Sequence, residues 1–382
     1  MTSSDPGRAR VRVALDATPL LGYRTGVGHV TAHLLSALDA RPELDVTGYA
    51  VTWRGRDALV AALPAGVRAA TKPFPARIAQ ALWATVNVPR IEHWTGPVDV
   101  VHGTNFVAPP SRAPVVVTVH DLTFARYPEL CTPATLRAAK VLARAIDRGA
   151  TVHTVSDFVA REAQELLALS PERVVRIYAG TMPSMGGDAA RGRALAGSSR
   201  YVLALGQLEP RKNFPRLVEA FAQCAARDAE LRLVIAGPDG WERPTFERAV
   251  ANTRHGDRVA WLGYVNDADR RDLLAGCRVF AYPSLYEGFG HPPLEAMQCG
   301  VPIVASNTGA LPEVLGDAAL LVDPLDVAAL AEALQRALDD EELRAQLTAR
   351  GSARVARFDW TTAASEFTDL YAQLTRGDRA NR

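Results

Sequence analysis

Three kinds of sequence follow one another in the stretch Val279-Phe-Ala-Tyr-Pro-Ser-Leu-Tyr-Glu287-Gly-Phe-Gly-His-Pro-Pro-Leu-Glu295: an apolar run, a glycine-rich segment and a helical pattern. The apolar run Val279–Tyr282 predicts a buried strand, the glycines predict a turn, and Pro292–Cys299 predicts a helix. Two carboxylates, Glu287 and Glu295, span the turn, whose backbone amides can bind hydroxyl or phosphate oxygens. A strand that passes through a glycine-rich turn into a helix is a building block of α/β folds.

The same alternation of short apolar strands and helical patterns extends along the chain in both directions. In the first half we expect strands over 11–15, 46–51, 98–102, 115–120, 151–155 and 173–178, with helices over 28–40 and 133–148. In the second half we expect strands over 201–205, 231–236, 259–262, 279–282, 303–306 and 319–322, with helices over 215–227, 267–276, 292–299, 327–350 and 359–375. This alternation predicts α/β architecture with two parallel sheets, each covered by helices on both faces.

The glycine-rich segment between Gly180 and Gly197 interrupts the alternation. A length of 382 residues also favours about two domains. We expect a Rossmann-like domain over 1–182, a linker over 183–199, a second Rossmann-like domain over 200–357 and a C-terminal helix over 358–382 that crosses back to the first domain. Because ligands of open α/β sheets bind beyond the carboxyl ends of strands, the crevice between the domains is the expected site.

Composition excludes several classes of function. The net charge of +1 gives no global electrostatic case for nucleic-acid binding. The chain contains no run of roughly 18 apolar residues, so no membrane-spanning helix is predicted. The first residues lack the apolar region of a secretory signal. The four cysteines show no CxxC spacing, which favours a reducing cytoplasm over a disulfide framework or a zinc site. We therefore expect a cytoplasmic protein.

A basic motif, Gly206-Gln-Leu-Glu-Pro-Arg211-Lys212-Asn213, follows the first strand of the second domain and opens a helix. Two adjacent cations near a helix N-terminus suit a diphosphate. The alternative is a solvated basic pair. The position after a strand favours a function, and so does the scarcity of lysine, since Lys212 is one of only three lysines.

The first domain carries weaker signals. Gly26 and Gly28 follow a strand and precede a helix, so their backbone amides can approach a phosphate, although a plain loop turn fits as well. His120 and Asp121 end one strand, and Asn105 follows the strand before it, which makes all three candidates for ligand contacts. The alternatives are a structural histidine and a turn-capping asparagine.

Together these motifs resemble retaining glycosyltransferases of the GT-B fold, specifically glycosyltransferase family 4. Glu287 to Glu295 matches the family's E-x7-E motif, and Arg211 to Asn213 matches its basic element. The segments 303–307, 311–314, 120–122 and 156–158 also look like family elements. One departure is Gln207, where many relatives carry arginine.

The resemblance implies roles for the second domain. Lys212 and Arg211 would hold the diphosphate of a nucleotide sugar, and Glu295 would bind the ribose hydroxyls. Glu287 would face the donor sugar. The remaining donor contacts implied by the resemblance are the amides of Phe289 and Gly290 on the sugar hydroxyls, and Tyr264 and Val265 on the base.

For the first domain, the resemblance implies that Gly26 and Gly28 approach the donor phosphates. His120 would lie near the donor sugar and the attacking acceptor, so His120, Glu287 and Lys212 are the expected catalytic residues. Asn105 and Asp121 are expected on the acceptor side. Relatives stabilise the leaving diphosphate without a bound metal, and no DxD element stands in a convincing loop here. We therefore expect no metal and no tightly bound cofactor.

The substrates are less defined than the family. The segment His120-Asp-Leu-Thr-Phe with a later Tyr-Pro-Glu looks like bacterial mannosyltransferases of polysaccharide assembly. GDP-mannose is therefore the favoured donor, with a UDP-sugar or dTDP-rhamnose as alternatives. Another GT-B enzyme, such as a phosphorylase or an epimerase, and a non-catalytic sugar- or nucleotide-binding protein are the remaining alternatives.

The acceptor is expected to be a glycan or a lipid-linked sugar. Residues 54–93 hold six Lys and Arg against one Asp and one Glu, with interleaved apolar side chains. Such a stretch can lie on an anionic membrane surface, which would make the enzyme peripheral at the inner face of the plasma membrane. The alternative is an ordinary pair of helices with a solvated basic face.

Overall fold

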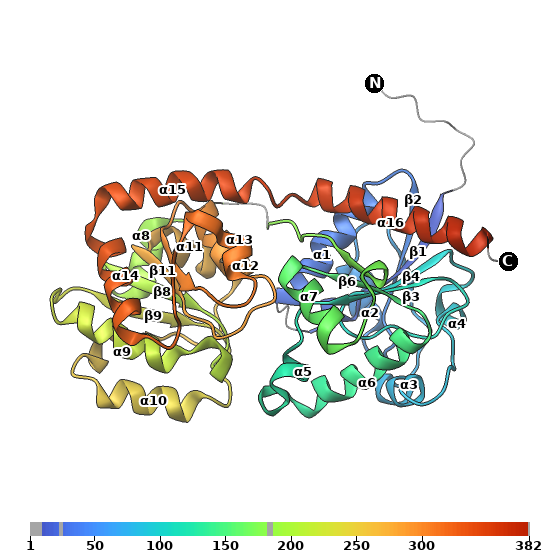
Figure 1. Cartoon of the computed structure of the whole chain (residues 1–382), viewed down its shortest axis with the longest axis horizontal. Helices are drawn as coiled ribbons and strands as arrows, with labels where there is room; N and C mark the ends of the chain where they lie inside the picture. The colour runs from blue at the N-terminus through green and yellow to red at the C-terminus, as the bar shows by residue number, and fades with distance from the viewer. Residues whose placement is uncertain (1–9, 23–25, 182–185, 381–382) are drawn as a thin grey trace, which may run out of the picture. The chain divides into compact units, whose positions relative to one another are not determined.

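The computed structural model describes residues 10–22, 26–181 and 186–380. The chain divides into two compact units (Figure 1). Unit 1 comprises residues 1–180 together with 358–382, and unit 2 comprises residues 181–357. Each unit contains one parallel sheet with helices on both faces, so the predicted α/β class is confirmed for both.

Unit 1 has a seven-stranded parallel sheet in the order β3-β2-β1-β4-β5-β6-β7. Its strands are β1 (Val11–Asp16), β2 (Leu44–Tyr49), β3 (Arg68–Ala70), β4 (Val100–Gly103), β5 (Val115–Val119), β6 (Thr151–Thr154) and β7 (Val174–Arg176). Its helices are α1 (Gly26–Asp39), α2 (Arg56–Ala62), α3 (Ala76–Trp83), α4 (Glu92–Thr95), α5 (Thr123–Arg126), α6 (Pro133–Asp147), α7 (Asp157–Leu166) and α16 (Trp360–Ala380).

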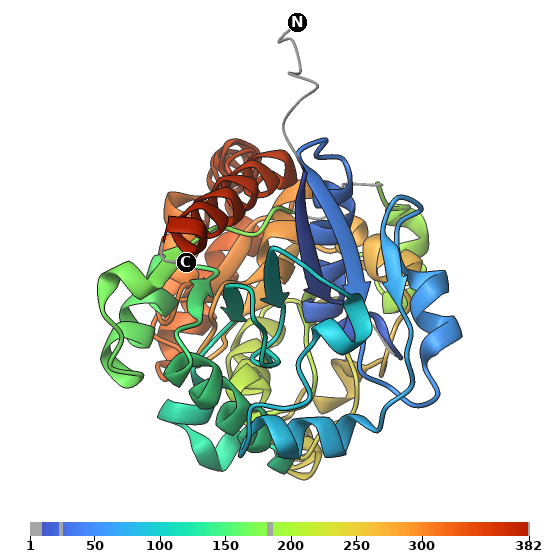
Figure 2. The same ribbon diagram turned by 90° about the vertical axis from the view of Figure 1, so that its right-hand side faces the viewer.

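Two apolar clusters cover the two faces of this sheet. Alternate residues of β1, such as Val13 and Leu15, pack with α1 and α16 on one face. Ala14 belongs to the other face, where Trp83 of α3 and Trp94 of α4 pack. The alternation follows from the two-residue period of a strand. Figure 2 shows α16, drawn in red, lying along unit 1 near the blue strands and helix of its N-terminal part.

A buried chain of hydrogen bonds joins α16 to three strands of unit 1. Ile177 presents a carbonyl, which can only accept, so His153 Nε2 must donate to it at 3.0 Å. The neutral ring then accepts at Nδ1 from the Thr118 hydroxyl, 2.9 Å away. That hydroxyl must in turn accept from His102 Nε2 at 2.8 Å, which leaves His102 Nδ1 to accept from the Tyr371 hydroxyl at 2.6 Å. The end carbonyl thus fixes every donor and both tautomers.

Both histidines of this chain are held neutral. Burial lowers the pKa of His153 from 6.5 to about 3. Burial also holds the pKa of His102 well below its ordinary value, with a smaller contribution from the neighbouring His153. The chain is therefore a property of the folded protein near neutral pH.

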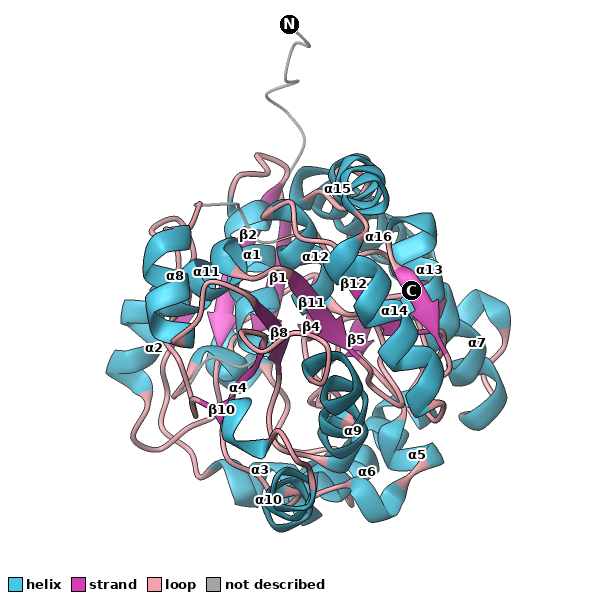
Figure 3. Ribbon diagram, turned by 90° about the vertical axis from the view of Figure 1, so that its left-hand side faces the viewer, coloured by secondary structure: helices cyan, strands magenta, loops and turns pink. Residues whose placement is uncertain are grey.

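Unit 2 has a six-stranded parallel sheet in the order β10-β9-β8-β11-β12-β13 (Figure 3). Its strands are β8 (Tyr201–Leu205), β9 (Arg232–Ala236), β10 (Val259–Trp261), β11 (Val279–Tyr282), β12 (Ile303–Ser306) and β13 (Leu320–Val322). Its helices are α8 (Ala189–Ala196), α9 (Phe214–Ala225), α10 (Arg243–Asn252), α11 (Asp267–Gly276), α12 (His291–Gln298), α13 (Leu311–Leu315), α14 (Val327–Asp339) and α15 (Glu341–Val355).

Each sheet contains one point where the chain reverses the direction in which it adds strands. In unit 1 this switch lies between β1 and β4, and in unit 2 it lies between β8 and β11. In open α/β sheets, ligands bind beyond the carboxyl ends of the strands at such a switch point. The segments that follow these four strands are the first place to look for a ligand site.

The second half of the predicted linker is wrong. Residues 189–196 form α8, which packs on α11 as part of unit 2. Asp188 caps this helix by accepting from the backbone of Ala190 at 2.8 Å and of Arg191 at 3.1 Å. A Cβ at Gly192 would overlap the carbonyl oxygen of Asp272, so this glycine permits close packing.

Further elements differ from expectation. The predicted helix over 327–350 is two helices, because Asp340 ends α14 and its carboxylate accepts from Leu343 to begin α15. The short edge strand β3 was not expected, since Arg-Ala-Ala lacks the β-branched and aromatic residues typical of strands.

Candidate functional site

The basic motif of unit 2 follows β8 directly and turns back toward the sheet. Gly206 directly follows the strand with φ +157°, and a Cβ there would lie 3.1 Å from the Lys212 side chain. Residues 210–212 form one 3-10 turn, after which Asn213 adopts a left-handed conformation with φ +59°. The Asn213 amide donates to the carbonyls of Pro283 and Pro324, at 3.0 and 2.8 Å. These contacts fix the turn against the segments that follow β11 and β13.

Lys212 is buried, with 8% of its surface exposed, and lies at the switch point of unit 2. Its Nζ donates to Glu287 Oε1 at 2.6 Å and to the Tyr282 hydroxyl at 2.8 Å. Arg211 approaches the other oxygen of Glu287 at 2.7 Å and also pairs with Glu209 at 2.7 Å. Two cations and two carboxylates therefore form one charge-balanced cluster.

Glu287 is ionised in this cluster. Burial opposes ionisation, but Arg211 and Lys212 outweigh it and lower the pKa of Glu287 to about 2. Burial lowers the pKa of Lys212 as well, against the opposing charge of Glu287. A buried charge pair of this kind is costly unless it is well hydrogen-bonded, and it is a frequent mark of a functional site.

The loop after Glu287 is held by the segment that follows β12. Ala310 donates its backbone N–H to the Glu287 carbonyl at 2.9 Å. At Gly309, which has φ +63°, a Cβ would lie 2.6 Å from the same carbonyl oxygen. Phe289 is buried, and Gly290 adopts φ +108° immediately before α12. The predicted residues Phe289 and Gly290 thus lie in a rigid turn between the two carboxylates.

Glu295 lies within α12 and is paired. Arg270 of α11 donates to Glu295 Oε1 at 3.1 Å and approaches Oε2 at 2.9 Å. Burial raises the pKa of Glu295, although Arg270 opposes this change. The predicted base contacts Tyr264 and Val265 stand just before α11, whose cap is Asn266. Tyr264 is 55% exposed.

In unit 1, His120 follows β5, and its Nε2 lies 2.8 Å from the Thr104 carbonyl. Since a carbonyl accepts, Nε2 carries the proton and Nδ1 of the neutral ring is an acceptor. Burial lowers the pKa of His120, while the Thr104 hydrogen bond opposes that change. His120 is therefore neutral near pH 7.

The other predicted residues of unit 1 differ in their surroundings. Gly26 and Gly28 open α1, with Gly26 exposed and Gly28 buried. Asp121 accepts from the backbone of Thr123 at 3.0 Å, which is a turn contact at the start of α5. Asn105 has a buried Oδ1 without a hydrogen-bond partner among the described residues. Asn105 thus has more free bonding capacity than a turn-capping asparagine.

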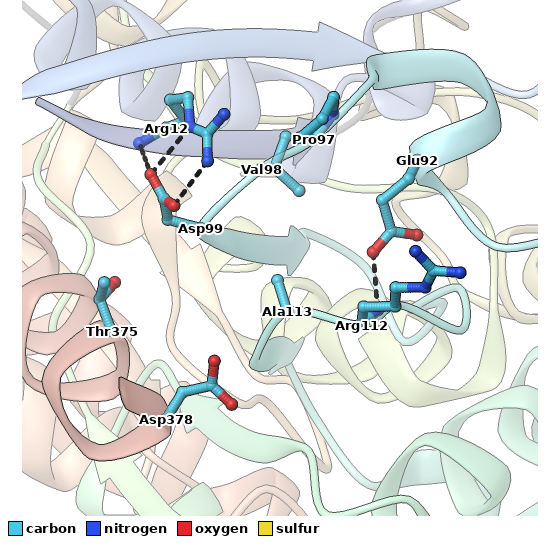
Figure 4. A pocket seen from close by; sticks show the side chains of 9 residues that line it. All are labelled: Arg12, Glu92, Pro97, Val98, Asp99, Arg112, Ala113, Thr375 and Asp378. Atoms are coloured by element: carbon cyan, nitrogen blue, oxygen red, sulfur yellow. Dashed lines mark hydrogen bonds and ion pairs between the residues drawn. The ribbon is translucent and has the colours of Figure 1, made fainter. Parts of the chain in front are cut away.

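A cavity of about 430 Å³ in unit 1 lies away from these residues (Figure 4). Its wall includes Arg12 and Asp99, which pair at the amino-terminal ends of β1 and β4, and Asp378 near the end of α16. Ligands of open α/β sheets bind at the opposite edge. No cluster of three or more His, Cys, Asp or Glu in the described ranges could hold a metal ion.

Sequence reasoning missed three members of the unit 2 site. These are Tyr282 beside Lys212, Glu209 beside Arg211, and Arg270 beside Glu295. Tyr282 ends a predicted strand, and that position was a usable signal. Arg270 lies on a helix among other charged residues, where nothing in the sequence distinguishes it from a solvated side chain.

The fold and the site together define a class. Two Rossmann-like units, the second with a buried lysine and two carboxylates after β8 and β11, are the features of a GT-B glycosyltransferase. The model of "Glycosyltransferase Family 4" matches residues 24–184, and that of "Glycosyl transferases group 1" matches residues 189–354. The chain belongs to glycosyltransferase family 4.

Individual relatives agree with this assignment. An O-antigen chain mannosyltransferase B of Escherichia coli is 35% identical over 285 residues, which cover 72% of this chain and 74% of the relative. A phosphatidyl-myo-inositol mannosyltransferase of Mycobacterium tuberculosis is 28% identical over 90% of this chain and 93% of its own.

Solved structures support the fold. A sucrose-phosphate synthase from Thermosynechococcus elongatus matches with a TM-score of 0.74 at 23% identity, covering 96% of this chain and 100% of its own. Anabaena Alr3699/HepE in complex with UDP and glucose matches with a TM-score of 0.72 at 21% identity, covering 95% and 100%.

Proposed function

We propose that this glycosyltransferase is retaining and moves mannose from GDP-mannose to a glycan or lipid-linked acceptor. The observation that carries the proposal is the buried cluster of Lys212, Arg211 and Glu287 at the switch point of unit 2. The named activities of the relatives support mannose as the sugar.

The geometry supports an electrostatic mechanism. Negative charge develops on the diphosphate as the sugar leaves, and two cations that are already fixed stabilise it without reorganisation. Lys212 and Arg211 would take this role, with Glu287 toward the sugar and Glu295 on the ribose. The acceptor would attack from the face that the diphosphate leaves, through an oxocarbenium-like transition state. The leaving phosphate would take the acceptor's proton, so no protein base and no bound metal are required.

His120 would lie beside the donor sugar. Because its Nε2 is committed to the Thr104 carbonyl, only Nδ1 can face a substrate, and it can accept a hydrogen bond from a sugar hydroxyl. Gly26 and Gly28 would approach the donor phosphates at the start of α1.

The test of the cluster is Lys212→Ala, which should reduce turnover by about 10²–10³-fold, as expected for one lost charge-stabilising donor. The matched control is Lys140→Ala, an exposed lysine of α6, which should leave turnover unchanged. Circular dichroism would check that both variants fold. Near-normal turnover in folded Lys212→Ala would remove this lysine from the mechanism.

The donor and the reaction class need separate measurements. Calorimetric titration with GDP, UDP and dTDP discriminates the three donor classes, and GDP should bind most tightly. A phosphorylase would need phosphate, and an epimerase would convert the nucleotide sugar without an acceptor. A non-catalytic binding protein would release no nucleoside diphosphate in a single turnover. The anomeric configuration of the product, read by NMR, decides between retention and inversion.

We also propose that unit 1 docks on an anionic membrane surface at the cytoplasmic face. Exposed Ile78, Val86 and Val88 lie on and after α3, interleaved with exposed Arg77 and Arg90. This mixture of apolar and basic side chains suits the interface of an anionic bilayer. Among the described residues, no helix combines the length and apolar character needed to cross a membrane.

Sedimentation with vesicles tests this docking. The protein should bind vesicles that contain phosphatidylglycerol, and added salt should weaken binding. Ile78→Asp should abolish it, whereas Trp241→Asp, at an exposed tryptophan of unit 2, should not. Binding to neutral vesicles alone, or equal loss in both variants, would contradict the proposal.

A further inference from the structure

The last residue of β1, Asp16, is a buried carboxylate with one uncommitted oxygen. Only 5% of the residue is exposed. Its Oδ1 accepts from the Thr18 backbone at 2.9 Å and from the Thr18 hydroxyl at 2.6 Å, and these bonds shape the turn after the strand. Its Oδ2 accepts no hydrogen bond from the described residues and is not sealed from solvent. The turn therefore occupies only Oδ1, and Oδ2 is left to accept a hydrogen bond from a ligand.

A second polar group without a partner lies on the neighbouring strand. Tyr49 ends β2 and is the register partner of Asp16, so both side chains leave the parallel sheet on the same face. Tyr49 is 3% exposed, and its hydroxyl has no partner among the described residues. Burial and then the charge of Asp16 raise the pKa of Tyr49, so the two groups interact without a hydrogen bond. Both groups thus have unused hydrogen-bonding capacity.

These groups lie at the edge of the sheet where the other candidate acceptor contacts of unit 1 are found. Thr104 donates its hydroxyl to the Asp16 carbonyl at 2.8 Å and accepts from His120 at 2.8 Å. The end of β1 and His120 are thus both hydrogen-bonded to Thr104. Asn105, with its unpartnered Oδ1, is the next residue along the chain. Buried polar groups without hydrogen-bond partners cost folding free energy. Several such groups at one edge of the sheet point to a polar ligand that forms the missing hydrogen bonds.

We propose that Asp16 and Tyr49 form a subsite of unit 1 that binds hydroxyl groups of a hexopyranoside acceptor. A carboxylate oxygen accepts two hydrogen bonds and therefore suits the hydroxyls of a sugar ring, while the tyrosine hydroxyl donates to one of them. The inference rests on the proposed function and names the acceptor class at its site. The competing possibility is a buried structural water that no substrate replaces.

The test is Asp16→Asn, assayed with octyl α-D-mannopyranoside as acceptor. Asparagine keeps the Oδ1 that holds Thr18 and replaces the uncommitted oxygen by an NH2 group. The KM for the acceptor should rise by about tenfold or more, the loss expected for a charge-assisted hydrogen bond. The KM for the donor, and the slow acceptor-independent release of nucleoside diphosphate, should stay within about twofold of wild type.

Tyr49→Phe should raise the same KM by a smaller factor, about threefold. The matched control is Thr47→Val, two residues earlier on β2, which removes another buried hydroxyl without a partner among the described residues. It should leave the KM for the acceptor unchanged. The melting temperatures of the three variants check their folding, because a residue with a merely structural role would lower the melting temperature when it is replaced.

Each remaining outcome is decisive. An unchanged KM for the acceptor in Asp16→Asn leaves a structural water as the explanation and overturns the subsite. Release of nucleoside diphosphate that the mannoside does not accelerate also overturns it, while the proposed transferase stands. If wild type releases no diphosphate from GDP-, UDP- or dTDP-sugars, the proposed function itself has failed.

Discussion

Acidification should destabilise unit 1 through the two histidines that join α16 to the sheet. A histidine whose pKa is depressed by folding contributes full stability above its unfolded pKa and loses it as the pH falls toward the folded value. For His153 that window runs from 6.5 down to about 3. Protonated His102 or His153 would also have to donate at both nitrogens, where the chain requires one donor and one acceptor.

The magnitude follows from the unfolded pKa. Each pH unit below 6.5 costs about 1.4 kcal/mol per buried neutral histidine, so pH 5 costs about 2 kcal/mol for His153. His102, whose pKa burial also holds well below its ordinary value, adds to this loss in the same direction. Even the contribution of His153 alone is a large fraction of the stability of a typical domain.

Urea unfolding at pH 8 and pH 5 measures this loss, with tryptophan fluorescence as the probe, since Trp83 and Trp94 are buried in unit 1. Other groups titrate in the same range, so wild type is compared with His153→Gln. Glutamine can still accept from Thr118 and donate to Ile177, but it does not titrate. The variant should lose about 2 kcal/mol less than wild type between the two pH values. Equal losses would refute the assignment of the acid sensitivity to this chain.

Three further predictions concern the site of unit 2. Gly309→Ala should lower turnover at least about tenfold and reduce thermal stability, because the new Cβ would meet the Glu287 carbonyl in a conformation that alanine rarely adopts; a wild-type rate would contradict this. Arg270→Ala should raise the KM for the donor about tenfold with a smaller change in kcat, because Glu295 loses the cation that orients it; a change confined to kcat would count against it. Treatment with EDTA should leave turnover unchanged, and loss of turnover that Mg²⁺ or Mn²⁺ restores would show that the reaction uses a metal.

The sequence placed Lys212 and Glu287 near one another because each follows a strand, and parallel strands end at the same edge of a sheet. Their direct contact could not be predicted, since it depends on β8 and β11 being neighbours in the sheet. Strand order is set by crossovers that leave no local signal. The same reasoning explains why Tyr282 was overlooked although its strand was expected.

Glycines have two structural roles here, close helix packing and a turn with positive φ, and the sequence alone does not distinguish them. Gly192 reads as a flexible linker residue, but it permits α8 to approach α11. Gly290 reads as part of a turn, and its φ of +108° agrees with that interpretation. The difference lies in the tertiary neighbours, such as Asp272, which only the folded chain brings close.

The place of α16 in unit 1 bears on how the protein is made. Phe367 and Tyr371 belong to the buried core of unit 1, yet the ribosome adds them after all of unit 2. Synthesis at about 5–20 residues per second separates Gly180 from Phe358 by on the order of ten seconds or more. At the end of that time unit 2 has its whole sequence, while unit 1 still exposes the groove that α16 will fill. Unit 1 is thus completed after unit 2, and the nascent chain depends on α16 to close the core of unit 1.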